Sequence, residues 1–405
     1  MITIHKIIKH ILTALCIFTI IWSIKFITTQ KWSNIDEYAH MDYIEKLAIG
    51  QMPLSSDQIC NEIFDHTINY PEKSVVGKPL TRSELGLANY SYQAQHPPLY
   101  YSVLLAPNML MKKMNVDVFS RVIVLRLISY AFLVIGIFLW IPICGKLNKL
   151  GFKIPKSYAI GGVLFGLLVA THERYGIGNN LLSPLLINGS ILLLLQYHLT
   201  PSNKLLYSFV FLMCLSVTSA LTNLFAFPIL FGVLFIKYYK NISAKNLIIS
   251  ISILSFFGLL FYLWKTLFVP EKIMGDFIQG FFKINFPANV LNLKGFTLLL
   301  MEDTFSLGFI NKSINLGNYF LIFFISNTLL CMIFINSIYK NQKWLIIVLF
   351  AITYFILLLW YLSTNIAGPT WVSFRHYLGL IPLFYLSCTS FLIVPFMKRK
   401  TNSAF

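Results

Sequence analysis

A carboxylate, an imidazole and a phenol recur at helical spacing near the start of the chain. Asp36, His40 and Tyr43 stand at positions i, i+4 and i+7, which places them on one face of a helix. A carboxylate with an imidazole beside it can accept a proton from a substrate, and the same pair can hold a metal ion. Glu37 points about 100° away around the helix axis. It either assists this chemistry or serves only as a favourable charge in the first turn.

A second polar group follows later in the chain, in the sequence QHPPLYY. His96 stands directly before two prolines, and prolines suit the first turn of a helix. Asp36, His40 and His96 can together form a site for a divalent metal, although no spacing in the sequence requires one. We therefore leave metal use open.

Two short helices are expected to position these residues. From Asn34, a suitable N-cap, to Gly50 the apolar residues follow a helical period for about three turns. The stretch 99–111 is apolar but too short to cross a bilayer. We interpret it as a helix in the membrane interface, with Tyr100 among its anchoring residues. Together the two helices are predicted to form a ledge over the membrane-spanning helices.

The composition is that of an integral membrane protein. The chain has 405 residues, of which 57% are hydrophobic and 12% charged, whereas a soluble domain has about 25% charged residues. Spans of about 20 apolar residues recur, and the sequence predicts an all-α fold of ten membrane-spanning helices. These are expected near 7–27, 121–145, 157–171, 181–198, 205–221, 222–239, 246–268, 318–338, 344–362 and 376–396.

The net charge of +17 reflects topology and not nucleic-acid binding. With the N-terminus inside, the inner connections hold 15 of the 32 basic residues and no acid, while all 15 acids lie in or beside outer segments. This asymmetry follows the positive-inside rule. It predicts cytoplasmic N- and C-termini, with some attraction of the lysines to anionic lipid.

The polar residues are concentrated in outer segments of a single membrane domain, residues 1–405. The first outer segment covers 28–120, and the second long one covers 269–317 with a further surface helix expected near 289–301. Cys60 is the only cysteine in an outer segment, so no disulfide is expected there. Any chemistry is therefore expected on the outer face.

The sequence DEYAHMDYIEKLAIGQMP after the first span, paired with QHPPLYY, resembles the GT-C superfamily of membrane glycosyltransferases. The resemblance is greatest to bacterial members related to protein O-mannosyltransferases and aminoarabinose transferases. SRVIVLRLISY matches an Arg-rich turn of that family, and FRHYLGLIP is similar to its Arg-Tyr motif near the last span. Order and topology match over nearly the whole chain, and the motifs match over 34–54 and 93–101. No C-terminal soluble domain like that of many members is expected in this chain, which leaves the acceptor undetermined.

The resemblance implies an enzyme of the cell membrane, bacterial by its relatives, that uses a polyprenyl-phosphate sugar on the outer face. Inversion at the anomeric carbon needs a carboxylate base, a role implied for Asp36. Glu37 and His96 would assist it. His40, Tyr43 and Tyr100 are expected to bind substrate.

The departing phosphate needs a cation or a metal. Arg375 can hold it bidentately, or can equally be an interfacial arginine whose charge reaches water. Arg126 lies inside the second span, where a cation is costly and usually functional or paired. Glu302 and Asp303 are the reserve carboxylates.

Two other functions are compatible with the sequence. A transporter or flippase for a lipid-linked sugar would favour charges and Gly or Pro breaks in mid-membrane, and apart from Arg126 the spans offer few. A non-catalytic assembly protein could keep the same fold. A polysaccharide polymerase or ligase is a neighbouring enzyme class, which differs in whether the donor carries one sugar or a chain. The sugar, the acceptor and the oligomeric state are left open.

Overall fold

The structure is a computed structural model, and outside its longest gap, 269–405, it describes most of the chain. In the described part all regular structure is helical, apart from one isolated bridge between Gln58 and Tyr90. The described residues are 2–29, 37–54, 56–68, 90–150, 154, 156–169, 176–220, 223, 230–231, 234 and 242–268.

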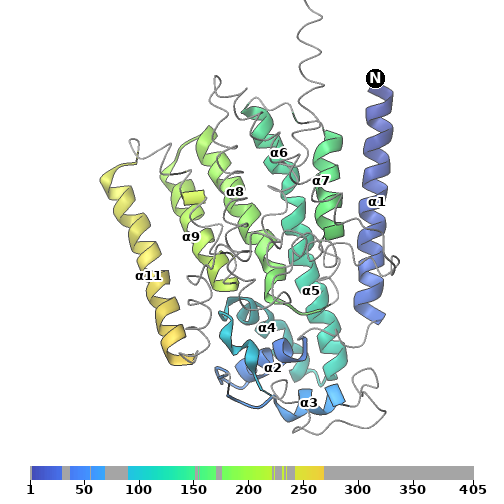
Figure 1. The fold of residues 1–405 in the computed structure, drawn as a ribbon, viewed down its shortest axis with the longest axis vertical. Helices are drawn as coiled ribbons and strands as arrows, with labels where there is room; N and C mark the ends of the chain where they lie inside the picture. Colours follow the sequence, from blue (N-terminus) through green and yellow to red (C-terminus); the bar gives the residue numbers. More distant parts are fainter. Residues whose placement is uncertain are drawn as a thin grey trace, which may run out of the picture.

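Long helices run side by side in a bundle (Figure 1). Their order in the chain is α1 (Ile2–Thr29), α5 (Val118–Phe138), α6 (Trp140–Lys149), α7 (Lys156–Val169), α8 (Ser183–Leu199), α9 (Asn203–Ser219) and α11 (Ala244–Phe268). α5 and α6 meet at a single turn residue, Leu139, and form one apolar run of 32 residues from Val118 to Lys149. The 3-10 turn η5 (Asn179–Leu182) leads into α8.

Short helices gather at one end of the bundle, where α1 ends and α5 begins (Figure 1). They are α2 (Glu37–Ala48), α3 (Asn61–Ile68), η3 (Tyr92–Gln95) and α4 (Leu99–Lys113). The two predicted helices of this region are thereby observed as α2 and α4. α3 lies in a polar stretch for which the sequence predicted no helix.

The structure supports four of the ten predicted spans. Four helices are long and apolar enough to cross a bilayer: Lys6–Thr29, Val118–Lys149, Asn179–Leu199 and Ala244–Leu267. The predicted spans 157–171 and 205–221 correspond to α7 and α9, which have 14 and 17 residues. Most of 222–239, the last three predicted spans, and the second outer segment with its helix near 289–301 lie outside the described residues.

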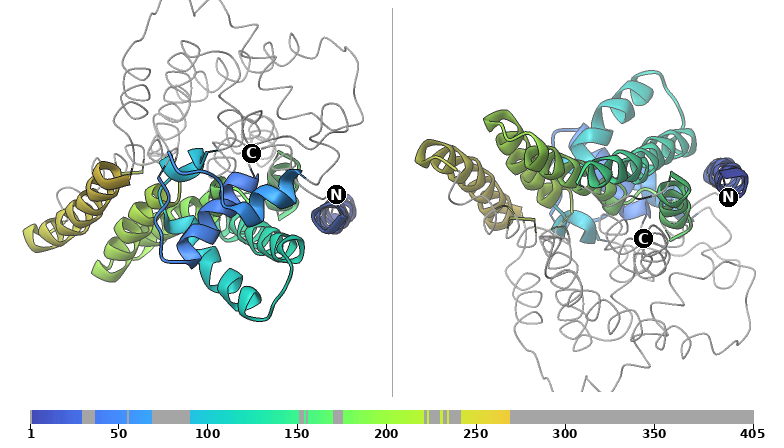
Figure 2. Two further views of the ribbon diagram at one scale, coloured as in Figure 1. Left: turned by 90° about the horizontal axis from the view of Figure 1, so that it is seen from below. Right: turned by 90° about the horizontal axis from the view of Figure 1, so that it is seen from above.

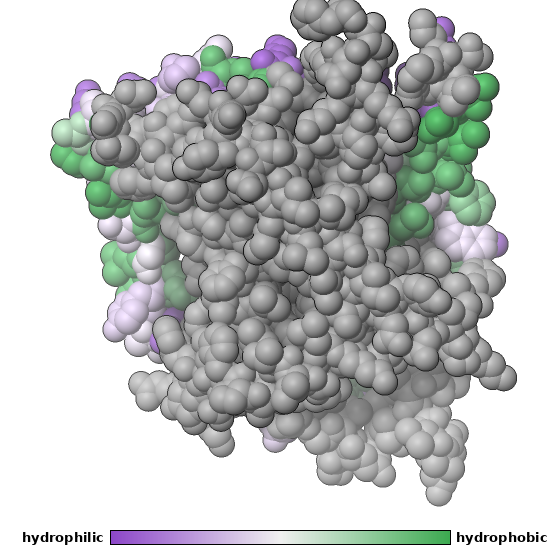
Figure 3. Space-filling view, turned by 45° about the horizontal axis from the view of Figure 1, so that its top comes forward, coloured by the Kyte–Doolittle hydropathy of each residue, from purple (hydrophilic) through white to green (hydrophobic). Residues whose placement is uncertain are grey.

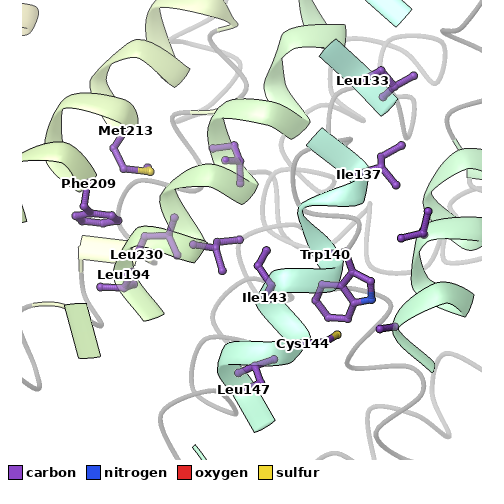
Figure 4. Close-up of a cluster of buried hydrophobic side chains, with 14 of the residues drawn as sticks. Leu133, Ile137, Trp140, Ile143, Cys144, Leu147, Leu194, Phe209, Met213 and Leu230 are labelled. Atoms are coloured by element: carbon purple, nitrogen blue, oxygen red, sulfur yellow. The ribbon is translucent and has the colours of Figure 1, made fainter. Parts of the chain in front are cut away.

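The helices pack around an apolar centre. α1 packs on α7, α5 on α8, α8 on α9, and α9 on α11. Figure 4 shows part of the resulting cluster, with Trp140 and Ile143 of α6 and with Phe209 and Met213 of α9. α1 and α11 form the two flanks (Figure 2), and they expose apolar side chains such as Phe18 at 62% and Ile248 at 63%. An apolar outer surface of this kind is expected for helices that face lipid.

Acidic residues lie at only one end of the described bundle, whereas basic residues lie at both ends. The described acids all lie in or beside α2, α3 and α4: Glu37, Asp42, Glu45, Asp57, Glu62, Asp65 and Asp117. Lysines lie at the opposite end, where α6 ends and where α1, α7, α9 and α11 begin. In Figure 3 hydrophilic residues lie along the upper rim, above apolar residues on both flanks. This arrangement agrees with the charge asymmetry that the sequence showed.

Gly136 allows α5 and α8 to approach closely. A Cβ atom at this position would lie 2.3 Å from the backbone nitrogen of Leu185 and 2.5 Å from the carbonyl carbon of Pro184. The Asn188 amide Nδ2 also donates a hydrogen bond of 2.8 Å to the Gly136 carbonyl. Small residues and interhelical hydrogen bonds of this kind stabilise helix pairs in membranes.

We expect Gly136→Ala to destabilise the protein by about 1–3 kcal/mol, because backbone atoms of α8 must move to admit the methyl group. Gly145 on α6 is the matched control, since a Cβ there meets nothing within 4 Å. Gly145→Ala should leave stability unchanged or raise it slightly, as alanine favours a helix. Thermal unfolding in detergent measures both, and equal midpoints for the two variants would contradict the close contact.

Candidate functional site

Helix α2 is polar in sequence and yet buried along most of its length. Every residue from Glu37 to Lys46 is buried, including the charged Glu37, Asp42, Glu45 and Lys46. Burying a charge is costly unless it is paired and hydrogen-bonded. The structure pairs all four charges, and the contacts tie α2 to segments from four other parts of the chain.

The first contact is a bidentate ion pair between Glu37 and Arg126 of α5. The Nε and Nη2 atoms of Arg126 each donate a 2.6 Å hydrogen bond to one carboxylate oxygen of Glu37, and both side chains are 0% exposed. The backbone N–H of Ile177 donates to the same carboxylate at 2.9 Å. Arg126 also donates through Nη1 to the carbonyl of Ile27 at 3.2 Å. One ion pair thus joins the start of α2 to α1, to α5 and to the turn before α8.

This geometry bears on two residues that the sequence singled out. Arg126 was predicted to be functional or paired, and it is paired, with Nε, Nη1 and Nη2 all directed at protein groups. A phosphate would have to displace Glu37 to reach it. The Glu37 carboxylate is likewise enclosed, and this favours a positioning role for the residue that directly follows Asp36 in sequence. Asp36 itself lies outside the described residues.

Four aromatic and histidine rings form a column beside this ion pair. The rings of Tyr43 and Tyr101 stack with centroids 3.8 Å apart and planes 6° apart. His40 lies next to Tyr101, with ring centroids 5.7 Å apart and a hydrogen bond of 2.8 Å between its Nδ1 and the Tyr101 hydroxyl. His96 continues the column, 6.3 Å from His40. The half-buried His96 is the most exposed of the four rings, so the column leads from the buried α2 toward the surface.

The Tyr43 hydroxyl on α2 contacts the segment after η3 and the segment after α2. It donates to the His96 carbonyl at 3.3 Å and lies 3.6 Å from the sulfur of Met52. Burial raises the pKa of Tyr43. The net direction is upward, so the phenol remains protonated at neutral pH. It therefore acts as a hydrogen-bond donor and not as a base.

Tyr100 was expected to bind substrate, and its hydroxyl is engaged inside the protein. It shares a 2.7 Å hydrogen bond with Ser129 of α5 and accepts one of 3.0 Å from the backbone N–H of Gly178. The side chain is 0% exposed. These contacts link α4, α5 and the turn before α8, which favours a structural role.

A second charge pair on α2 holds two distant segments together. Asp42 and Lys46 form a salt bridge of 3.1 Å one turn apart. Asp42 accepts hydrogen bonds from the Cys60 backbone N–H at 2.7 Å and from the Ser91 hydroxyl at 2.5 Å. Lys46 donates to the Gln58 carbonyl at 2.7 Å and to Ser91. The residues before α3 and before η3 are thereby fixed against α2, and η3 leads directly to His96.

A third group of charges joins α2, α3, α4 and α5. Arg121 of α5 forms salt bridges with Glu45 of α2 and Glu62 of α3. Lys112 of α4 contacts the same two acids, at 2.6 and 3.4 Å. Burial lowers the pKa of Lys112, but hydrogen bonding and charge from Glu45 and Glu62 raise it more. Asn108 completes the group by donating to Glu45 at 2.9 Å.

We expect Ser91→Ala to destabilise the short-helix region by about 1–3 kcal/mol, because it removes a hydrogen-bond partner from two buried charges at once. Ser102→Ala on α4 is the matched control, since that exposed hydroxyl bonds only its own helix, at the Pro98 carbonyl. Hydrogen exchange of residues 57–68 and 90–96 reads out the effect locally. Unchanged exchange rates in Ser91→Ala would show that the hydroxyl does not hold these segments.

The structure brings together part of the predicted site. His40, Tyr43 and His96 meet in the ring column, and Glu37 and Arg126 meet in the ion pair. Among the described residues no group of three or more His, Cys, Asp or Glu side chains is placed to hold a metal ion. Arg375, Glu302 and Asp303, like Asp36, lie outside the described residues.

Two residues of this region were not singled out from the sequence: Ser91 and Arg121. Arg121 stands at the start of the second predicted span, in SRVIVLRLISY. Tyr101 was predicted only to anchor its helix in the membrane interface, and in the structure it stacks on Tyr43. Nothing local in the sequence marks Ser91, whose partners Asp42 and Lys46 lie far away along the chain.

Comparison with models of known protein families, with curated proteins and with solved structures found no match to this chain.

Proposed function

We propose that this protein is a membrane glycosyltransferase that moves a sugar from a polyprenyl-phosphate donor to an acceptor on the extracytoplasmic side. The observation that carries the proposal is the buried, fully charge-paired helix α2 at one end of an apolar bundle. A polar platform at a membrane boundary suits a donor whose lipid lies in the bilayer and whose phosphate and sugar lie at its surface.

In this proposal Asp36 is the base that deprotonates or orients the acceptor. Glu37, paired with Arg126, holds the start of α2 against the second span and so positions the residue before it. His96, which lies next to His40, assists Asp36. Preorganisation of this kind is required because small displacements of a catalytic group are costly in rate.

The departing phosphate is assigned to Arg375 and not to Arg126. Charge develops on the leaving oxygen as the bond to the sugar breaks, and a cation held ready there lowers the barrier. Arg126 is committed to Glu37 and the Ile27 carbonyl. A divalent metal could supply the same charge, and chelation by EDTA distinguishes the two possibilities.

The test is consumption of a panel of radiolabelled polyprenyl-phosphate sugars by purified protein in detergent, with solubilised membrane extract as the source of acceptor. The proposal predicts that one donor is consumed. A flippase needs two membrane leaflets and leaves every donor intact in micelles. Cooperative unfolding shows that the purified protein is folded. If every donor of the panel stays intact with such protein, the protein is not a transferase.

A further inference from the structure

Seven lysines surround the end of the bundle opposite α2, and we name them the basic rim. They lie near the start of α1, at the end of α6, and at the starts of α7, α9 and α11; they are Lys6, Lys9, Lys146, Lys149, Lys156, Lys204 and Lys245. Six are exposed and Lys146 is half-buried. In the part of the chain that the structure describes, no aspartate or glutamate lies at this end. Among the described residues the rim is therefore a positive surface without acidic partners.

The basic rim borders the exposed apolar surfaces of α1 and α11. On α1, Lys9 is followed by Ile11, which is 54% exposed, and on α11 Lys245 is followed by Ile248, which is 63% exposed. Figure 3 shows hydrophilic residues above apolar ones on both flanks. A lysine at such a boundary extends its methylene stem along the apolar surface and places its ammonium group at the depth of lipid headgroups. An acidic soluble protein would bind lysines without needing an apolar surface beside them, so their position beside apolar residues favours a lipid.

Helix direction adds to the positive potential. α1, α7, α9 and α11 all begin at the rim (Figure 1), and the N-terminal end of a helix carries partial positive charge. Two of these starts are joined, because Asn246 donates a 2.7 Å hydrogen bond to Asn203 and accepts one of 2.8 Å from Tyr207. The lysines next to these asparagines, Lys204 and Lys245, are held on neighbouring helix ends.

We propose that the basic rim binds the headgroups of anionic phospholipids, most tightly along the joined starts of α9 and α11. Clusters of lysine beside a membrane-spanning helix attract such lipids, and the attraction decreases as salt is added. The bound lipids stabilise the folded chain, since they bind the assembled rim and not separated helices. This inference does not depend on the proposed enzymatic activity.

The experiment compares thermal unfolding of the full chain in nanodiscs of phosphatidylcholine with and without phosphatidylglycerol. The wild-type midpoint is expected to rise by several degrees with phosphatidylglycerol, and the rise is expected to disappear at high salt. The rim variant Lys9→Gln/Lys204→Gln/Lys245→Gln should lose at least half of the rise. The control variant Lys25→Gln/Lys113→Gln/Lys265→Gln removes the same charge at the other end of the helices, and it should keep the rise.

Two results would overturn the proposal. One is a wild-type midpoint that is the same in both nanodiscs. The other is an equal loss in the rim and control variants, which would show a general charge effect. If the triple rim variant does not fold, Lys245→Gln alone is compared with Lys265→Gln on the same helix, with the same expected difference.

Discussion

Replacing Arg126 by glutamine is expected to lower the free energy of unfolding by about 3–5 kcal/mol, because it leaves the carboxylate of Glu37 buried without its counter-ion. The effect should be large because both side chains are 0% exposed and the pair is bidentate. The Ile177 N–H still donates a hydrogen bond to that carboxylate, but it carries no full positive charge. Thermal or denaturant unfolding of purified protein in detergent measures the loss.

The double variant Glu37→Gln/Arg126→Gln is the control for this prediction. With both charges removed, no isolated charge remains buried, so the double variant should be more stable than the sum of the two single losses implies. Losses that simply add would contradict a direct ion pair. The stability of Arg126→Lys should lie between that of the wild type and that of Arg126→Gln. Lysine keeps the positive charge, but its ammonium group cannot reproduce the two parallel hydrogen bonds.

Asp36→Asn is expected to reduce the rate of sugar transfer by about 10²–10⁴-fold, the range typical of losing a general base. The side chain keeps its size, so the thermal midpoint should not change. The reduction should appear in kcat, since the base acts on the acceptor during the reaction and not in holding the donor. Initial rates of donor consumption under saturating donor measure it.

Asp65→Asn is the matched control, since Asp65 is an exposed carboxylate on α3 near the same end of the bundle. Its rate should equal that of the wild type. If Asp36→Asn also transfers sugar at the wild-type rate, Asp36 is not the base, and Glu302 and Asp303 are tested next in the same way.

Hydropathy and helical period predicted the four long apolar helices and the short helices α2 and α4. Each of the four long helices contains a stretch of 18 residues with high mean hydropathy. The apolar period of α2 is ended by Gly50, and that of α4 is preceded by two prolines. Gly50 indeed has a positive φ of 76°, which terminates α2 as a glycine is expected to. α3 was missed because its eight residues, NEIFDHTI, give too short a period to recognise.

The surroundings of α2 could not be predicted in the same way. Its alternation of Glu, Asp and Lys is the pattern of a solvated helix face, and only the folded structure shows that these charges are buried. Their partners are remote: Glu37 pairs with a residue 89 positions away, and Glu45 with one 76 positions away. Arg126 is the exception. An arginine within a membrane span is rarely left unpaired, so the sequence predicted either a functional role or a partner for it.

A transferase moves the sugar from the prenyl phosphate to a new covalent partner, and a donor labelled in both parts follows this transfer. Purified protein in proteoliposomes would receive a polyprenyl phosphate with one radioactive isotope in the prenyl chain and another in the sugar, together with acceptor-containing membrane extract. We expect the two labels to separate with wild-type protein, with the sugar label in the acceptor fraction, and to stay together with Asp36→Asn. Labels that remain on one molecule in the wild type, whether or not that molecule crosses the bilayer, would contradict a transferase.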